Sequence, residues 1–331
     1  MRAIISNHAG GPDSLSLEDI GTPQANPGEV IVDIRAIGVN FADTLIIEDK
    51  YQFRPERPFS PGGELSGVIT ALGDGVTSLK VGDRIAAYSC FNAMREQIAL
   101  PANVCVKLPD AMDFDIAAGF MITYGSSYYG LKQRGQLRAG ETLLITGAAG
   151  GVGVTAIELG KVMGAHVIAA VSSEDKAEFC RSKGADDAII YPRAPLDKAA
   201  QKALSQQIRA QAGDRGVDVI YDAIGGDYAE PALRTLNWGG RYLVIGFASG
   251  IPAMPLNLPM LKTLDIRGVF WGAWAEKFPQ EHATNVAEMM QMFANGQIRP
   301  EISAHYPLER AADALTALKE RRAHGKIVVE I

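Results

Sequence analysis

The stretch that decides the fold is residues 141–176, ETLLITGAAGGVGVTAIELGKVMGAHVIAAVSSEDK. It reads as an apolar strand, a glycine-rich loop, a helix and a second apolar strand, the order of a parallel βαβ unit. A dinucleotide fingerprint has the form G-x-G-x-x-G, because N–H groups at the helix start must closely approach a pyrophosphate. Gly150 and Gly153 fill its second and third glycine positions, whereas Ala148 stands at the first. We therefore predict a nucleotide-binding loop formed by Ala149, Gly150, Gly151, Val152 and Gly153.

The residues after the second strand of this unit indicate which dinucleotide binds. NAD sites usually carry an Asp or Glu there, whose carboxylate accepts hydrogen bonds from the ribose hydroxyls. Here the strand ends at Val171-Ser172-Ser173. Ser172 can donate a hydrogen bond to a 2′-phosphate and Lys176 can place a positive charge beside it, so we predict NADPH. Tyr191, at the end of the next predicted strand, is either packed beside the adenosine phosphate or an ordinary tyrosine at the core edge.

Strands alternate with helices from about residue 116 onward. Between the strands, helix-like spacing of apolar residues occurs at 154–163, 173–182 and 196–211. Two further helices, at 281–295 and 308–319, are predicted in a short mixed end that follows Pro259. Strands that alternate with helices form a parallel sheet with right-handed crossovers. This part of the chain is therefore predicted to be a doubly wound α/β domain.

The chain before about residue 118 has a different character. Short apolar runs separated by Gly, Pro and Asp occur at 30–37, 65–71, 84–88 and 96–100. Such runs predict a compact, mainly antiparallel β domain. The last strand, KIVVEI (326–331), is similar in character to this first region. We therefore expect the first domain to be discontinuous in sequence.

Composition narrows the possible functions. With 331 residues, 47% of them hydrophobic, the chain is long enough for two domains of about 150 residues each. A net charge of −6 without a Lys/Arg block argues against a nucleic-acid partner. No apolar stretch reaches the ~20 residues of a membrane span, and the N-terminus does not resemble a signal peptide. Three cysteines without a CxxC pair favour a reducing compartment, so we expect a cytoplasmic protein.

The ordered motifs resemble the medium-chain dehydrogenase/reductase superfamily and, within it, the zinc-independent quinone oxidoreductases, which include zeta-crystallin. The matching segments are GVNFADTLIIEDKY (38–51), PGGELSGVITALGDGVTSLKVGDRI (61–85), GAAGGVGVTAIELGKVMGA (147–165), GVDVIYDAIGG (216–226) and HGKIVVEI (324–331). The resemblance implies a Rossmann domain inserted into a GroES-like, mainly β domain. On this basis the GroES-like substrate domain is expected at 1–122 and 262–331, and the Rossmann NADPH-binding domain at 123–261.

The same resemblance shows which metal ligands are missing. Zinc alcohol dehydrogenases of this superfamily carry a Cys ligand near the GVNFAD segment and a His ligand in a Gly-His-Glu triplet. Here Asn40 and its neighbours offer no thiol, and Gly63 stands at the His position. We therefore predict no metal site, and we expect Glu64 to be a buried, hydrogen-bonded structural group.

Further site residues follow from the resemblance alone. Asn40 and Tyr51 match catalytic positions beside the nicotinamide and the substrate, although Tyr51 also fits a partly buried surface tyrosine. Positions expected to border the cofactor are Thr123, Ile245, Gly246, Phe247, Ala248, Phe270, Trp271, Gly272 and Lys326. For Phe270 and Trp271 the alternative is ordinary aromatic packing. For Lys326 the alternative is an exposed lysine before a strand.

The predicted reaction is hydride transfer from NADPH to a conjugated small-molecule acceptor, foremost a quinone. One alternative is reduction of a C=C bond in alkenals, enones or enoyl thioesters. In that case Tyr51 is the first candidate for the hydrogen-bond or proton donor, and Arg54 and Arg57 are candidates for contact with a coenzyme A phosphate. A second alternative is a non-enzymatic NADPH-binding protein. Relatives commonly pair the edge strands of two Rossmann sheets, so we expect a homodimer.

Overall fold

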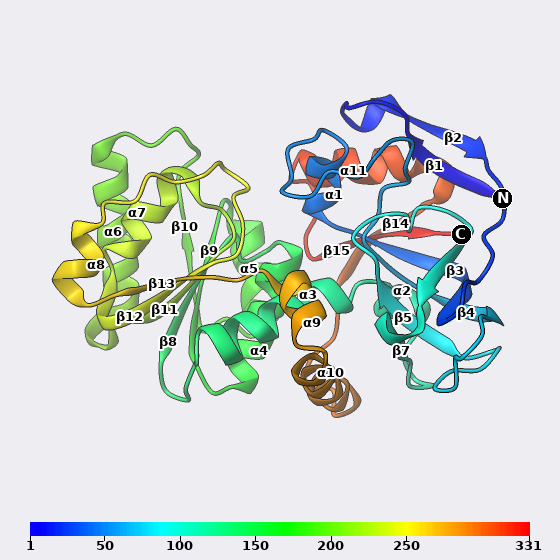
Figure 1. The fold of residues 1–331 in the computed structure, drawn as a ribbon. Coiled ribbons are helices and arrows are strands. Elements are labelled where there is room, and N and C mark those ends of the chain that lie inside the picture. The colour runs from blue at the N-terminus through cyan, green and yellow to red at the C-terminus, as the bar shows by residue number, and fades with distance from the viewer. The chain divides into compact units, whose positions relative to one another are not determined.

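The computed structural model describes all residues of the chain, 1–331, and they form two units (Figure 1). The first, which we call the β unit, consists of Met1–Ile122 and Pro300–Ile331. The second, the Rossmann unit, is Thr123–Arg299. None of the helices combines the length and apolar character that crossing a membrane would require.

The β unit is built on a seven-stranded sheet and a separate hairpin. The sheet has the order β14-β15-β3-β4-β5-β7, with β6 also paired to β3. Its strands are β3 (Glu29–Val39), β4 (Glu64–Leu72), β5 (Arg84–Tyr88), β6 (Gln97–Pro101), β7 (Cys105–Lys107), β14 (Ile302–Pro307) and β15 (Lys326–Glu330). The hairpin pairs β1 (Arg2–Ser6) with β2 (Leu15–Asp19). Its short helices are α1 (Phe41–Ile46), α2 (Phe114–Ala118) and α11 (Ala311–Lys319).

Strand β15 explains why the β unit is discontinuous. It pairs antiparallel with β3, so that Ile327 lies opposite Val39 and Glu330 opposite Ala36. Apart from the parallel pair β14–β15, every strand pair in this sheet is antiparallel. The apolar side chains of β3, β4 and β15 are buried together, which makes the late strand part of the same core as the early ones.

The Rossmann unit contains a six-stranded parallel sheet in the order β10-β9-β8-β11-β12-β13. The strands are β8 (Thr142–Thr146), β9 (His166–Val171), β10 (Asp187–Ile190), β11 (Val217–Asp222), β12 (Leu236–Val244) and β13 (Asp265–Gly268). The helices are α3 (Met121–Tyr129), α4 (Gly151–Val162), α5 (Glu174–Ser182), α6 (Lys198–Ala212), α7 (Ala229–Leu233), α8 (Asn257–Lys262), α9 (Trp271–Lys277) and α10 (Pro279–Ala294). Helix α4 covers one face of the sheet, and α6 and α7 cover the other (Figure 1).

The strand order reverses between β8 and β11. Strands β8, β9 and β10 run outward on one side, and β11, β12 and β13 run outward on the other. At this point the last residues of the two strands, Thr146 and Asp222, lie side by side in register. Open α/β sheets bind ligands in the crevice outside the carboxyl ends of the strands at such a switch point. The topology therefore locates the candidate nucleotide site within this unit.

The boundary between the units differs from the prediction at its second position. Residues 262–299 belong to the Rossmann unit, so the prediction that placed them with the β unit is wrong. The physical reason is that β13 pairs parallel with β12 along Asp265–Gly268. Helices α9 and α10 follow directly from that strand and pack against each other within the same unit.

Candidate cofactor and substrate site

The glycine loop between β8 and α4 forms a tight turn followed directly by a helix start. Gly147 has a φ of 68°, a left-handed conformation that favours glycine, and its carbonyl accepts a hydrogen bond of 3.0 Å from the Gly150 N–H. A Cβ on Gly153 would lie 2.4 Å from the Gly147 carbonyl oxygen, so only glycine fits there. Gly147 therefore supplies the turn that the sequence pattern had assigned to position 148.

The outer side of this loop is open. Gly150 is exposed and caps α4, whereas Gly151 and Val152 are half-buried and Ala149 is buried. A Cβ on Gly150 would meet only the Gly147 oxygen, at 3.4 Å. The first N–H groups of a helix have no intrahelical partner and carry the positive end of its dipole. This loop can therefore hold a pyrophosphate, as its sequence predicts.

Three predicted residues gather at the carboxyl ends of β9 and β10. Ser172 is exposed, and Lys176 is half-buried in the first turn of α5, where its backbone N–H donates to the Ser173 hydroxyl at 3.4 Å. Tyr191 follows β10, and its N–H donates to the Val171 carbonyl at 2.9 Å. Its ring packs against Tyr228, with the centroids 4.8 Å apart. A serine, a lysine and a tyrosine thus lie together at the carboxyl ends of these two strands.

The loop after β12 is anchored to the end of β11. The N–H groups of Ile245 and Gly246 donate to the Asp222 carbonyl at 2.9 and 3.3 Å, and the Ala248 N–H donates to the Ala223 carbonyl at 3.4 Å. Phe247 is 37% exposed. The predicted segment 245–248 therefore lies at the carboxyl edge of the sheet, on the side of the switch point opposite to Lys176.

The remaining predicted cofactor residues of this unit differ in burial. Thr123 is buried, and its carbonyl accepts a hydrogen bond of 3.1 Å from the Thr155 hydroxyl. Trp271 is buried against α3, since a Cβ on Gly125 would lie 2.5 Å from its ring. The indole of Trp271 thus packs within this unit, whereas Phe270 is 57% exposed and a Cβ on Gly272 would meet no atom within 4 Å.

In the β unit, Lys326 forms a buried ion pair with Glu64. Its ammonium also donates to the Val39 carbonyl at 3.0 Å and to the Asn40 side-chain oxygen at 2.9 Å. All three N–H bonds of the ammonium are used inside the unit, and the side chain is buried. The alternative that Lys326 is an exposed lysine is therefore wrong. Its approach to the cofactor stays a prediction. The burial results from the pairing of β15 with β3.

Glu64 is the centre of this cluster. Its carboxylate accepts hydrogen bonds from the Asn40 amide at 3.0 Å and from the Ile122 N–H at 2.9 Å, in addition to the ion pair with Lys326. Glu64 is fully buried, as the sequence predicted for a structural carboxylate. The Asn40 amide nitrogen also donates to the Gly38 carbonyl at 3.2 Å. Both ends of the Asn40 amide are thus engaged within the cluster, and its role beside the substrate stays a prediction.

Asp43 completes this cluster, although it is not among the site residues predicted from the sequence. It is buried at the third position of α1, where its carboxylate accepts the Asn40 N–H at 2.8 Å and closes a capping box. Burial raises the pKa of Asp43 to about 7, the hydrogen bond from Asn40 and the charge of Lys326 oppose the shift, and Glu64 adds to it. The capping-box spacing Asn40-x-x-Asp43 was the signal that could have identified it.

Tyr51 lies beyond this cluster in the same unit. It is half-buried against the core, and burial raises the pKa of its phenol, with further contributions from Cys90 and Asp43 nearby. The phenol therefore stays protonated and can act as a hydrogen-bond donor. Of the two arginines considered for coenzyme A, Arg57 is tied to Asp49 at 2.9 Å, and Arg54 is exposed.

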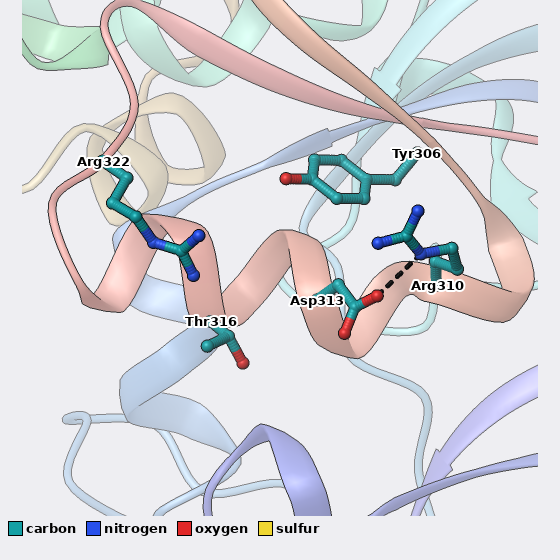
Figure 2. Close-up of a pocket in the computed structure, with 5 residues that line it drawn as sticks. All are labelled: Tyr306, Arg310, Asp313, Thr316 and Arg322. Atoms are coloured by element: carbon teal, nitrogen blue, oxygen red, sulfur yellow. Dashed lines mark hydrogen bonds and ion pairs between the residues drawn. The ribbon is translucent and has the colours of Figure 1, made fainter.

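A separate hollow of about 200 Å³ lies on the surface of the β unit, beside α11 (Figure 2). Its lining residues are Tyr306, Arg310, Asp313, Thr316 and Arg322. Arg310 pairs with Asp313 at 2.7 Å, as the dashed line in Figure 2 marks. None of the predicted site residues lines it, so this hollow is separate from the candidate site.

Both units match known sequence families. Residues 26–110 match the alcohol dehydrogenase GroES-like domain, and residues 151–289 match the family described as zinc-binding dehydrogenase. A quinone oxidoreductase-like protein 2 homolog of Nematostella vectensis is 35% identical over 336 residues, covering 99% of this chain and 88% of the relative. Quinone oxidoreductase of Homo sapiens is 31% identical, covering 95% of this chain and 92% of the relative.

A solved structure has the same fold. Escherichia coli quinone oxidoreductase complexed with NADPH matches with a TM-score of 0.92 and 27% identity, and the match covers 100% of both chains. This chain belongs to the quinone oxidoreductase family. The predicted superfamily and the predicted combination of a GroES-like domain with a Rossmann domain are confirmed, and the protein is an oxidoreductase of this family.

The description of the second family raises the question of zinc, and the residues of this family member do not fit it. No group of three or more His, Cys, Asp or Glu side chains lies close enough together to hold a metal ion. At the expected ligand position stands Gly63, where a Cβ would lie 3.3 Å from the Cys90 carbonyl oxygen. Both oxygens of the neighbouring Glu64 are occupied by protein donors. The residues at this position therefore do not form the ligand set that a catalytic zinc requires.

Proposed function

We propose that this quinone oxidoreductase family member transfers hydride from NADPH to a quinone without a metal ion. The observation that carries the proposal is the grouping of Ser172, Lys176 and Tyr191 at the carboxyl ends of β9 and β10, beside an open glycine loop. NADPH, when bound, supplies the hydride. The α4 N-terminus would hold its pyrophosphate, and Lys176 its 2′-phosphate.

The residues of this chain contribute mainly binding and orientation. The loop 245–248 lies at the same edge of the sheet and would border the second half of the dinucleotide. Reduction of a quinone gives a stabilised hydroquinone anion, which water can protonate. Tyr51, held protonated by its raised pKa, would donate a hydrogen bond to the oxygen on which negative charge develops.

Steady-state oxidation of NADPH by the purified protein tests the acceptor. The candidates are a 1,4-quinone, a 2-alkenal and an enoyl-CoA, each at matched concentration. We expect turnover with the quinone to exceed turnover with the other two. Preference for the alkenal or the enoyl-CoA would replace the proposal with C=C reduction. Tight NADPH binding without turnover of any acceptor would indicate a non-enzymatic role.

The cofactor is tested by Lys176→Ala. Removing one charged contact to the 2′-phosphate is expected to weaken NADPH binding roughly tenfold while leaving NADH binding unchanged. Lys183→Ala, at the other end of α5, is the matched control and should change neither affinity. An unchanged ratio of the NADPH and NADH affinities in Lys176→Ala would show that Lys176 does not bind the 2′-phosphate.

Absence of zinc from the active enzyme is part of the proposal. Metal analysis of the purified protein by mass spectrometry should find no stoichiometric zinc, and activity should survive dialysis against a chelator. One zinc per chain that is lost together with activity would overturn this part. The cytoplasm is the proposed compartment, on the sequence grounds given above.

A homodimer is also proposed. Strand β13 is the edge of the parallel sheet and pairs only with β12. Ile266 on this strand is 39% exposed, and apolar side chains before it, Leu256, Met260 and Leu261, are 58–74% exposed. An exposed strand edge flanked by apolar side chains suits pairing with the same edge of a second copy.

A further inference from the structure

Asp222 is a buried carboxylate that the proposed function does not use directly. It is the last residue of β11 and is 2% exposed. One carboxylate oxygen accepts the Thr146 hydroxyl, and it also accepts the Ile224 N–H at 3.0 Å and the Gly225 N–H at 3.1 Å. The other accepts the Tyr242 hydroxyl and, at 3.2 Å, the Gly225 N–H. All of these donors are neutral, so the carboxylate acts as a hub of hydrogen bonds rather than as half of an ion pair.

The donors come from the two strands that flank β11 at the switch point and from the turn that follows β11. Thr146 ends β8 and lies opposite Asp222 in register, and Tyr242 comes from β12 on the other side. Asp222 therefore ties β8, in one half of the sheet, to β11 and β12 in the other half. This is the place where a dinucleotide crosses from one mononucleotide-binding half to the next.

The turn after Asp222 connects this hub with two loops of the candidate site. Ile224 lies against the glycine loop, since a Cβ on Gly147 would be 3.0 Å from its side chain. The Ile224 carbonyl accepts the Ser249 N–H at 2.8 Å. A Cβ on Gly225 would lie 2.6 Å from the Gly250 oxygen, so the turn and the loop after β12 pack with no spare room. Moving the turn must therefore move both loops.

We propose that Asp222 is a positioning residue that shapes the half of the crevice taking the nicotinamide mononucleotide part of NADPH. The inference rests on the proposed NADPH site. Lys176 and Ser172 follow β9, in the first half of the sheet, and are proposed to take the adenosine phosphate. The turn at 224–226 and the loop 245–250 belong to the second half of the sheet. They are therefore the segments that would contact the second mononucleotide.

The mechanism is preorganisation. With the carboxylate in place, two backbone N–H groups and two hydroxyls have a fixed common acceptor, and the turn has one conformation before any ligand arrives. Without it, those groups lose their acceptor and the turn can relax. Binding of the mononucleotide that contacts the turn must then order it, and the free energy that this ordering requires weakens the binding. A ligand occupying only the adenosine half escapes this cost.

The test compares two ligands by isothermal titration calorimetry. NADPH occupies both halves of the crevice, whereas adenosine 2′,5′-bisphosphate occupies the adenosine half only. In Asp222→Ala, the dissociation constant for NADPH should rise about tenfold or more, and that for adenosine 2′,5′-bisphosphate should stay within about twofold. Asp222→Asn keeps one acceptor oxygen and should restore part of the NADPH affinity.

Two tyrosines provide a matched pair that avoids removing the carboxylate. Tyr242→Phe deletes a hydroxyl that donates to Asp222, and it should weaken NADPH binding selectively even if Asp222→Ala fails to fold. Tyr221→Phe deletes an equally buried hydroxyl that is bonded at 2.8 Å to Ser127, and it should leave both affinities unchanged. Melting temperatures of the free proteins show how far each variant is destabilised.

Three results would decide against the proposal. Unchanged NADPH affinity in Tyr242→Phe and Asp222→Asn would overturn it, as would equal weakening of both ligands. A wild-type protein that binds neither ligand would instead refute the NADPH site itself, and the inference with it. Wild-type binding of both ligands, followed by selective loss of NADPH affinity in the variants, is the expected outcome.

Discussion

At the scale of single residues, Lys326 and Glu64 form a buried ion pair in the β unit. Both side chains are buried, and each also bonds to neutral groups of the protein. Removing one member leaves the other as an unpaired buried charge, which costs far more than the net stabilisation that the pair provides.

Lys326→Met is therefore expected to lower the free energy of unfolding by about 3–5 kcal/mol. Urea denaturation followed by circular dichroism measures it. Glu64→Gln in the Lys326→Met background should restore part of the loss, because no unpaired charge then remains. Additive effects of the two substitutions would contradict the assigned coupling.

The raised pKa of Asp43 leads to a second prediction, which concerns how the free energy of unfolding depends on pH. Its folded-state value of about 7 lies above the ordinary value of 3.8, so the folded state binds more protons than the unfolded state between these limits. Stability contributed by the protonated form is complete below about pH 4 and is lost as the pH rises to about 7.

Asp43→Asn removes this titration while it preserves an acceptor for the Asn40 N–H. The free energy of unfolding of the variant minus that of the wild type should therefore be larger at pH 8 than at pH 4. The increase should be about 1.4 kcal/mol for each unit by which the pKa of Asp43 is raised in the folded wild type. Urea midpoints at several pH values measure the difference. A difference independent of pH would show that Asp43 titrates normally.

At the scale of elements, the turn from β8 into α4 separates two roles of glycine. Gly153 is required by packing, because a Cβ there would overlap the Gly147 carbonyl, whereas Gly150 has room for one. Gly153→Ala should therefore lower the melting temperature by several degrees. Gly150→Ala should leave the melting temperature nearly unchanged but weaken NADPH binding, since its Cβ would point toward the open side of the loop.

Differential scanning fluorimetry with and without NADPH distinguishes these effects. The expected pattern is a low melting temperature for Gly153→Ala without ligand, and a reduced ligand-induced shift for Gly150→Ala. If Gly150→Ala retained the full shift, the exposed side of the loop would not be where the pyrophosphate binds.

The pattern of apolar residues was sufficient to predict most elements. The helix expected at 154–163 is α4, Gly151–Val162, and the strands expected at 30–37 and 65–71 are the central parts of β3 and β4. Such elements follow from local periodicity, which the sequence contains directly. The family segments extended this to the topology, because they occur in a fixed order along the chain.

What the sequence could not show depended on contacts between distant residues. The burial of Lys326 requires Glu64, which lies on another strand, and its charge alone favours exposure. The membership of β13 in the Rossmann sheet depends on its pairing with β12 rather than on its own composition. The role of Asp222 depends on Thr146 and Tyr242, which come from two other strands.

At the scale of the whole molecule, the exposed edge of β13 predicts the oligomeric state. Ile266→Lys places a charge on the edge strand, which prevents close pairing of two copies. The wild type should be a dimer by light scattering after size-exclusion chromatography, and the variant a monomer that retains its fold. Val81→Lys, at a more exposed apolar position of the β unit, should remain dimeric. A dimeric Ile266→Lys would place the contact elsewhere.

The discontinuity of the β unit also sets an order of events during synthesis. The strands of the Rossmann unit are contiguous in the chain, so all of them have left the ribosome while β15 is still being made. Domains generally fold as units as they emerge. Until Lys326 arrives, the nascent β unit has a buried Glu64 without its cation and a β3 edge without its neighbour. Residues 1–122, although made before the Rossmann unit, therefore reach their final form only after β15 has been added.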